Sequence, residues 1–315
     1  MNVFGPVLSR RLGLSLGVDP VASKTCNWNC VYCQLGMTFP MTGTRRRFCD
    51  PGQAIGEIVE QIGVPREKKI DWITFVGSGE TLLSIDMGIL IDAVKSMTDI
   101  PVAVITNGSM LGEREIMEEL RSADAVLPSL DAGTEDLYIR INRPMPAFSF
   151  QRHMEGLRRF RETFSGKLWI EVMLLKGIND SEEAIESISD RIEEINPDQV
   201  HLLTPTRPPA ESWVYPAGYE TLLLASSIIG RKFSILVPEE PIQNLKILSG
   251  SFSQSVKDIV KRHPLREEAV LLILGGVPPE EARSAMEELL SDGSISVIER
   301  MGIRFLVDRP SRYSF

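Results

Sequence analysis

Three of the four cysteines lie in one short segment, Cys26-Asn-Trp-Asn-Cys30-Val-Tyr-Cys33. Their spacing is C-x3-C-x2-C, and the aromatic Tyr32 directly precedes the last thiol. Thiolates this close in sequence can converge on one metal centre. Gaps of two or three residues are unfavourable for an unstrained disulfide. The segment therefore predicts a metal site.

The number of thiolates bears on which metal is bound. Structural zinc usually takes four protein ligands, and the sequence has no second Cys-x2-Cys or His-x3-His pair. A four-iron cluster is usually held by four thiolates, so three would leave one iron open to another ligand. The alternatives are three unligated thiols, or a zinc site completed by a distant His153, His201, His263 or Cys49.

Apolar strands alternate with amphipathic helices from Pro51 onward. A strand-like segment at 9–19 precedes the cysteines, and the later strands are expected at 71–76, 102–106, 125–130, 168–174, 199–204 and 233–237. Helices are expected at 52–63, 84–97, 113–121, 150–163, 181–194 and 217–229. This alternation is typical of a parallel sheet with right-handed crossovers. The predicted fold class is α/β, a partial (βα)6 TIM-type barrel with its chemistry at the carboxyl ends of the strands.

Polar and glycine-rich residues follow the predicted strands, as such a barrel requires. Strand 71–76 leads into Gly77-Ser78-Gly79-Glu80, where two glycines let the backbone approach a ligand closely. The later strands lead into Asn107 and Ser109, Ser129 and Asp131, Lys176, and Arg207 and Glu211.

The spacing of the cysteines resembles the signature of the radical S-adenosylmethionine (SAM) superfamily. The resemblance covers roughly residues 5–237 and implies a [4Fe-4S] cluster on Cys26, Cys30 and Cys33, whose open iron binds the amino and carboxylate groups of SAM. Gly77 to Glu80 resembles the superfamily's glycine-rich motif, which accepts the SAM amino group. The other cofactor contacts that the resemblance implies are Tyr32, Asn107, Ser109, Ser129, Asp131 and Arg143.

The resemblance also implies a reaction. The reduced cluster would cleave SAM, and the resulting 5′-deoxyadenosyl radical would abstract hydrogen from a substrate. The implied partner is a one-electron reductant such as flavodoxin or ferredoxin. The sequence does not identify the substrate, and its contacts are expected on the barrel rim at Arg10, Arg11, Lys176, Arg207 and Glu211.

Three segments resemble the wyosine-synthetase-related iron-sulfur oxidoreductases. They are the opening Phe4-Gly-Pro-Val-Leu-Ser-Arg-Arg, Asn142-Arg-Pro, and Thr204-Pro-Thr-Arg-Pro-Pro-Ala-Glu. True wyosine synthetases carry a second cluster on additional cysteines, and Cys49 is the one cysteine left over. The resemblance therefore implies the fold and the radical initiation. A tRNA-modifying enzyme of this type stays open as an alternative.

The tail is expected to be a separate unit. Residues 1–237 form the barrel, 238–250 form a linker, and 251–315 form a small α+β domain. Its expected helices at 252–262, 265–274 and 278–290 and a hairpin at 295–307 resemble a winged helix. The third helix carries Glu280, Glu281, Glu287 and Glu288 against Arg283, so it would repel phosphate. We expect a protein-contact, substrate-presenting or structural role for this domain. For the whole protein, the alternatives to an enzyme are a redox-sensing transcription regulator that binds DNA through the tail and a scaffold that delivers an iron-sulfur cluster.

Bulk composition agrees with an enzyme of the cytoplasm. Hydrophobic residues make up 43% of the chain, which is enough for a core, and the formal net charge of −9 argues against a broad nucleic-acid footprint. We expect no signal peptide and no membrane span, because the opening lacks a basic and apolar leader and no long uninterrupted apolar window occurs. A reducing compartment suits free thiolates.

Overall fold

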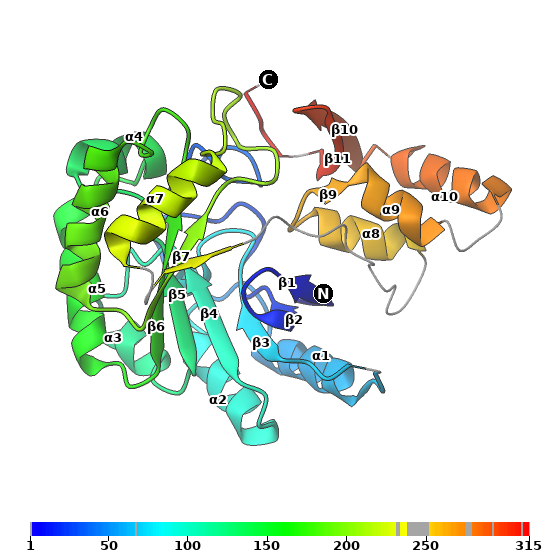
Figure 1. Cartoon of the computed structure of the whole chain (residues 1–315). Helices are drawn as coiled ribbons and strands as arrows, with labels where there is room; N and C mark the ends of the chain where they lie inside the picture. The colour runs from blue at the N-terminus through cyan, green and yellow to red at the C-terminus, as the bar shows by residue number, and fades with distance from the viewer. Residues whose placement is uncertain are drawn as a thin grey trace.

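The computed structural model describes residues 2–66, 68–230, 234–237, 252–274, 279–291, 293–309 and 311–314. It has a large α/β body with a smaller C-terminal body beside it (Figure 1). The linker expected at 238–250 lies outside the described residues. Within the described part of the chain, no helix has the length and apolar character needed to cross a membrane.

An eight-stranded sheet forms the centre of the large body, with its strands in the order β1 to β8. The antiparallel pair β1 (Val3–Ser9) and β2 (Gly13–Val18) forms one edge. Parallel strands follow: β3 (Trp72–Phe75), β4 (Val102–Thr106), β5 (Ala125–Pro128), β6 (Lys167–Met173), β7 (Gln199–Leu203) and β8 (Ser234–Leu236). The predicted α/β class with a parallel sheet of the partial TIM-barrel type is therefore confirmed.

The helices cover the outer face of this sheet (Figure 1). They are α1 (Pro51–Gly63), α2 (Met87–Met97), α3 (Arg114–Glu119), α4 (Glu135–Asn142), α5 (Phe150–Thr163), α6 (Glu182–Ile195) and α7 (Tyr219–Ile229), with a short 3-10 turn η1 (Thr81–Leu83). Capping residues in the sequence determine where several of these helices begin. Asp50 caps α1, which begins with Pro51, and Ser149 and Ser181 cap α5 and α6 by accepting backbone hydrogen bonds.

The main hydrophobic core lies between the sheet and these helices. Ile73 and Phe75 of β3 are fully buried, as are Ile58 of α1 and Leu90 and Ile91 of α2. Strands of a parallel sheet are buried on both faces, which is why they read as continuous apolar runs in the sequence. The core holds the carboxyl ends of the strands in register.

The segment at 9–19 differs from the expectation, because it is not one strand. Ser9 ends β1, its Oγ accepts hydrogen bonds from the backbone N–H groups of Arg11 and Leu12, and Gly13 has φ +63°. The chain therefore reverses direction here. As a result Arg10 and Arg11 lie in a turn at the amino end of β2. Their side chains nevertheless line one cavity with Arg207, and their role as substrate contacts stays a prediction.

Helix α4 was not expected from the sequence. Thr134 begins it, with its side chain accepting a hydrogen bond from Leu137 N, and Arg143 ends it in the left-handed region at φ +45°. Only Tyr138, Ile141 and Asn142 of this helix are buried, so its apolar pattern is too short to be recognised by periodicity.

The C-terminal body contains α8 (Phe252–Val260), β9 (Leu265–Arg266), α9 (Glu267–Leu274), α10 (Pro279–Ser291), β10 (Ile295–Arg300) and β11 (Ile303–Asp308). Its three strands form an antiparallel sheet in the order β10-β11-β9, with a core that includes Val256, Val270, Leu289 and Leu306. The body packs against β1, where the rings of Phe4 and His263 lie edge to face at 5.5 Å.

Candidate functional site

A cavity of about 260 Å³, here called the cysteine cavity, is lined by all three cysteines of the predicted metal site. They lie in the loop that follows β2. The loops after the next strands complete the wall, so the residues that follow separate strands meet at one end of the sheet. The wall residues contributed by these loops include Gly77, Ser78, Gly79, Glu80, Thr106, Asn107, Ser129 and Arg207.

A short parallel bridge between Thr25 and Gly79 holds the cysteine loop against the glycine-rich loop. Glu80 N donates to Thr25 O at 2.8 Å, and Lys24 N donates to Ser78 O at 2.6 Å. A Cβ atom on Gly79 would lie 1.8 Å from Thr25 O. The glycine is required here because two backbones approach closely.

Each cysteine sulfur in the cavity has a nitrogen donor beside it. Asn107 Nδ2 lies 3.8 Å from Cys26 Sγ, and Asn142 Nδ2 lies 3.7 Å from Cys30 Sγ. Lys24 Nζ lies 3.7 Å from Cys33 Sγ. Hydrogen bonds to sulfur stabilise thiolate ligands and tune the reduction potential of iron-sulfur clusters. The donor set therefore fits three thiolates that hold such a cluster.

Burial, in contrast to these donors, favours the protonated form of the metal-free thiols. It raises the pKa of Cys26 to about 12 and that of Cys30 well above its ordinary value. Both thiols are therefore protonated at neutral pH until a metal binds, and binding releases their protons. No three His, Cys, Asp or Glu side chains of the described residues could hold a single metal ion. Thiolates that each bind a different iron of a cluster do not need that arrangement.

Asp131 lies behind the cavity wall, 3% exposed. Tyr32 O–H donates to Asp131 Oδ2 at 2.6 Å, and Asn142 Nδ2 donates to the same oxygen at 2.7 Å. Met173 N donates to the other oxygen at 2.9 Å. The carboxylate therefore ties the cysteine loop to β6, while Tyr32 and Ser129 line the cavity itself.

Glu80 lines the cavity but is only 1% exposed. Its carboxylate accepts hydrogen bonds from Thr106 Oγ1 at 2.5 Å, Asn107 N at 2.7 Å and Leu82 N at 3.0 Å. Burial raises its pKa, and these donors oppose the rise. The side chain joins the loops after β3 and β4 into one wall.

The structure does not bring every predicted site residue to this cavity. Ser109 Oγ is buried and accepts a hydrogen bond from Asn27 Nδ2 at 2.8 Å. Arg143 pairs with Glu211, and neither lines the cavity. Lys176 is exposed. Arg207 reaches the cavity wall, and Arg10 reaches it from the opposite end of β2.

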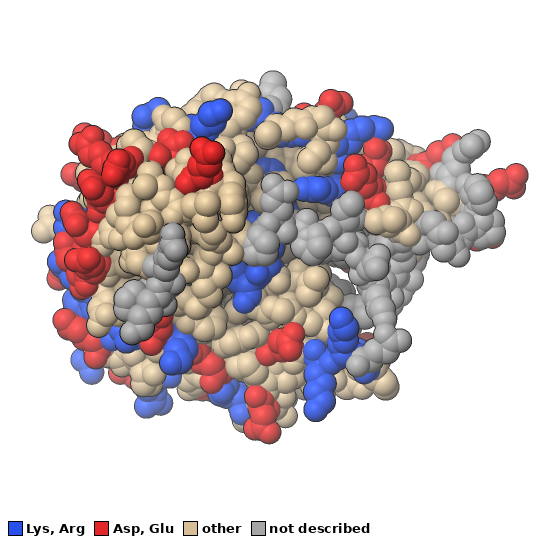
Figure 2. Space-filling model, viewed as in Figure 1, with Lys and Arg blue, Asp and Glu red and all other residues tan. Residues whose placement is uncertain are grey.

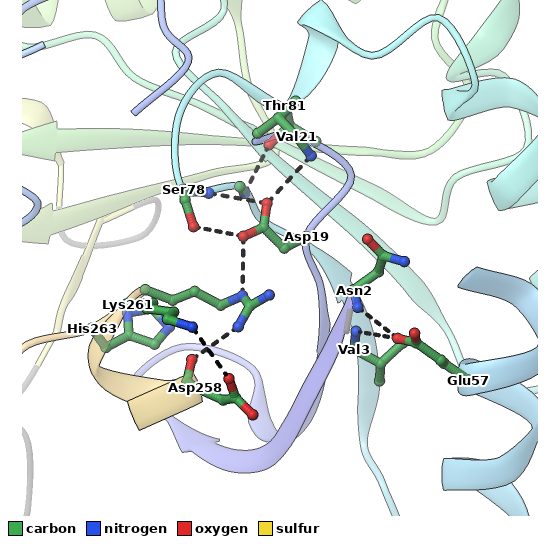
Figure 3. A network of polar contacts seen from close by, with 12 residues as sticks. Asn2, Val3, Asp19, Val21, Glu57, Ser78, Thr81, Asp258, Lys261 and His263 are labelled. Carbon is green, nitrogen blue, oxygen red and sulfur yellow. Dashed lines mark hydrogen bonds and ion pairs between the residues drawn. The ribbon is translucent and has the colours of Figure 1, made fainter. Parts of the chain in front are cut away.

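Four residues at the site were missed from the sequence: Asp19, Lys24, Asn27 and Asn142. Figure 3 shows Asp19 at the centre of a polar network, where it accepts hydrogen bonds from Ser78 O–H at 2.6 Å and Ser78 N at 3.1 Å. Asn27 directly follows Cys26 and Lys24 stands two residues before it, and this proximity is the one signal that could have identified them.

The ring of His153 packs behind the site. Its Nε2 lies 3.1 Å from Ser129 O, so it donates to that carbonyl, and the ring stacks on Tyr138 at 5.6 Å. Burial lowers the pKa of His153 to about 4. The unfolded chain binds a proton below about pH 6.5, whereas the folded chain does not until about pH 4. Folding stability is therefore lost as the pH falls through this window.

We expect His153→Gln to reduce this acid sensitivity. The glutamine amide can still donate to Ser129 O but does not titrate. From the shift, wild type should lose about 3 kcal/mol more than the variant between pH 7 and pH 4. Urea unfolding of both proteins at the two pH values measures this difference. Equal losses would show that His153 does not stay neutral in the fold.

Residues 21–188 match the family model described as the Radical SAM superfamily. The chain belongs to the radical SAM superfamily. It is 35% identical over 276 residues to a UPF0026 protein of Methanocaldococcus jannaschii, covering 86% of this chain and 85% of that one. It is 45% identical over 206 residues to a GTPase Obg of Brachyspira hyodysenteriae, covering 65% of this chain; the chain spans only 30% of that relative's length.

A solved structure of a radical SAM methyltransferase from Sphaerobacter thermophilus has a similar fold. The TM-score is 0.52 at 17% identity, covering 70% of this chain and 66% of that one. Radical SAM enzymes use a [4Fe-4S] cluster and S-adenosylmethionine, and they need an electron donor. The chain is therefore an enzyme of this chemistry, with its reaction subclass open.

Proposed function

We propose that Cys26, Cys30 and Cys33 hold a [4Fe-4S] cluster and that the cysteine cavity binds SAM beside it. When bound, the pair supplies reductive cleavage of SAM to a 5′-deoxyadenosyl radical that abstracts hydrogen from an organic substrate. The observation that carries the proposal is that the three thiols and the glycine-rich loop line one cavity at the carboxyl ends of parallel strands.

The residues of the chain would divide the work of binding and positioning. Gly77 to Gly79 line the cavity where the SAM amino group would bind, while Glu80 keeps their loop in place. Tyr32 and Ser129 present polar groups and an aromatic ring to the rest of the cofactor. Half-buried apolar side chains such as Val76 and Ile105 would exclude water from the reacting end.

The electron donor would be a one-electron carrier such as flavodoxin or ferredoxin. All four cysteines are free thiols in the structure, and three of them must stay reduced to bind iron. This requirement supports a place in the reducing cytoplasm.

Anaerobic reconstitution with iron and sulfide, followed by reduction in the presence of SAM, tests the proposal. We expect 5′-deoxyadenosine as a product. Cys30→Ala should lose the cluster and all cleavage, whereas Cys49→Ala should retain both. Cys49 is the matched control because it lines a different cavity, together with Asp19 and Arg262. Reconstituted protein that binds SAM but never cleaves it would refute the function.

The finer grouping with wyosine-synthetase-related oxidoreductases rests in part on the Asn142-Arg-Pro segment. Asn142 supports it, because its amide lies beside Cys30 at the site. We propose membership of that group without its tRNA reaction, because Cys49 alone cannot supply a second cluster. The domain limits 1–237 and 251–315 and a winged-helix type for the latter fit the separate core around Val270 and Leu306. The glutamates of α10 disfavour a role in DNA binding.

A further inference from the structure

A second cavity of about 260 Å³ adjoins the cysteine cavity inside the barrel. We call it the arginine cavity. Ser15 and Gly17 of β2, Thr74 of β3 and Met173 of β6 line it, so it lies within the sheet. The two cavities share a wall made of Arg10, Gln34, Val76, Ile105, Met173 and Arg207.

Arginine side chains dominate the charge of this second cavity. Arg10, Arg11 and Arg207 line it, whereas no Asp or Glu does among the described residues. Glu171 pairs with Arg11 at 2.9 Å but does not itself line the cavity. This concentration is unusual in a chain whose formal net charge is −9. Positive charge enclosed by low-dielectric walls attracts an anion strongly.

His263 lies beside the same positive charges, which affect its protonation. Arg207 Nη1 and Gln34 Nε2 each lie 3.0 Å from its Nδ1, so this nitrogen acts as the acceptor of a neutral ring. Burial lowers the pKa of His263 well below its ordinary value, and the charges of Arg207, Arg262 and Arg11 lower it further. The neutral imidazole therefore forms a polar part of the cavity wall and does not reduce the positive charge of the arginines.

The C-terminal body closes the arginine cavity. Ile259 of α8, His263 and Leu265 of β9 form its outer wall. The closure is held by an ion pair between Arg262 Nε and Asp19 Oδ2 at 3.0 Å and by a hydrogen bond from Gln34 Nε2 to Arg262 O at 3.2 Å. A cavity of this volume is smaller than most drug-sized pockets and suits a small molecule and not a polymer.

A basic groove, a cavity of about 160 Å³, also borders Arg207. Arg266 and Arg300 of the C-terminal body line it with Arg207, which therefore borders the groove and both cavities. In Figure 2, Lys and Arg atoms gather in the hollow between the two bodies, whereas Asp and Glu are frequent over the outer helices. This contrast would steer an anion into the hollow.

We propose that the arginine cavity is the substrate chamber and that it takes a small organic anion carrying a phosphate or carboxylate group. The anionic group lies among Arg10, Arg11 and Arg207, and the rest of the molecule faces the cysteine cavity across the shared wall. The assignment as a substrate chamber rests on the proposed function; the anion site itself is a property of the chain.

The test uses full-length, anaerobically reconstituted protein and two separate probes, inorganic phosphate and malonate. Isothermal titration should show one probe binding with one-to-one stoichiometry, both with and without saturating SAM; the better probe identifies the type of anion. Arg207→Gln and Arg10→Gln should each raise its Kd about tenfold or more, as expected for a lost charged contact. Arg207→Lys should retain most of the affinity and shows that the position tolerates substitution.

Arg121→Gln is the matched control, because it makes the same charge change at an exposed position after α3. An equal loss of affinity in this variant, or no saturable binding of either probe to wild type, would overturn the chamber. Displacement of the probe by SAM would also overturn it, because the arginines would then belong to the cofactor. Cleavage of SAM is measured separately, so intact anion binding without cleavage would count against the proposed function alone.

Discussion

Gly79→Ala is expected to prevent loading of the cluster. The new methyl group would lie 1.8 Å from Thr25 O and 2.5 Å from Thr25 C, and both are backbone atoms that cannot rotate away. The loop after β3 must therefore separate from Thr25, one residue before Cys26. Overpacking of this severity costs about 3 kcal/mol or more, equivalent to a hundredfold or more in an equilibrium constant. Iron and sulfide content after anaerobic reconstitution, together with the thermal midpoint, measures the effect.

Gly56→Ala is the control for this prediction. Gly56 is an exposed residue of α1, and a Cβ atom there meets no atom within 4 Å. Alanine in a helix interior stabilises by up to about 1 kcal/mol relative to glycine, so this variant should load the cluster normally. If Gly79→Ala loads as well as Gly56→Ala, the bridge to Thr25 is not what positions the cysteines.

The part of the site that sequence predicted depends on local spacing. Cys26, Cys30 and Cys33 must lie close together because few residues separate them, and Gly77 to Glu80 follows an apolar strand that could only be buried. The order of parallel strands then brings both loops to one end of the sheet. These inferences needed no knowledge of distant contacts.

What sequence could not predict depends on pairs far apart in the chain. Asp19 meets Arg262, 243 positions later, and no local pattern marks either as a partner. Arg10 and Arg11 were expected on the rim because the hairpin whose turn contains them was read as one strand. Asp131 was expected at the cofactor, but its hydrogen bonds with Tyr32 and Asn142 place it behind the wall. Tertiary contacts determine where these side chains point and how the C-terminal body contributes to the arginine cavity.

The ion pair between Asp19 and Arg262 joins the two bodies beside the glycine-rich loop, and we expect its loss to destabilise the fold. The side chains are 3% and 12% exposed, and Asp19 also accepts two hydrogen bonds from Ser78 (Figure 3). Arg262→Met leaves a buried carboxylate without its cation. Such a change costs about 3 kcal/mol. The free energy of unfolding in urea measures it.

A double-mutant cycle separates this pair from simple loss of packing. Arg262 also lies over the ring of Phe4 at 5.2 Å, and methionine keeps much of that contact. Asp19→Asn combined with Arg262→Met should cost less than the sum of the single changes by about 2 kcal/mol, because the pair is lost once. Arg158→Met provides the control: its pair with Glu194 is 44% and 33% exposed and should be worth less than about 1 kcal/mol. If the single effects at Asp19 and Arg262 are additive, the two side chains do not stabilise the fold as a pair. Other contacts would then hold the C-terminal body to the glycine-rich loop, and the wall that this body contributes to the arginine cavity would not depend on the pair.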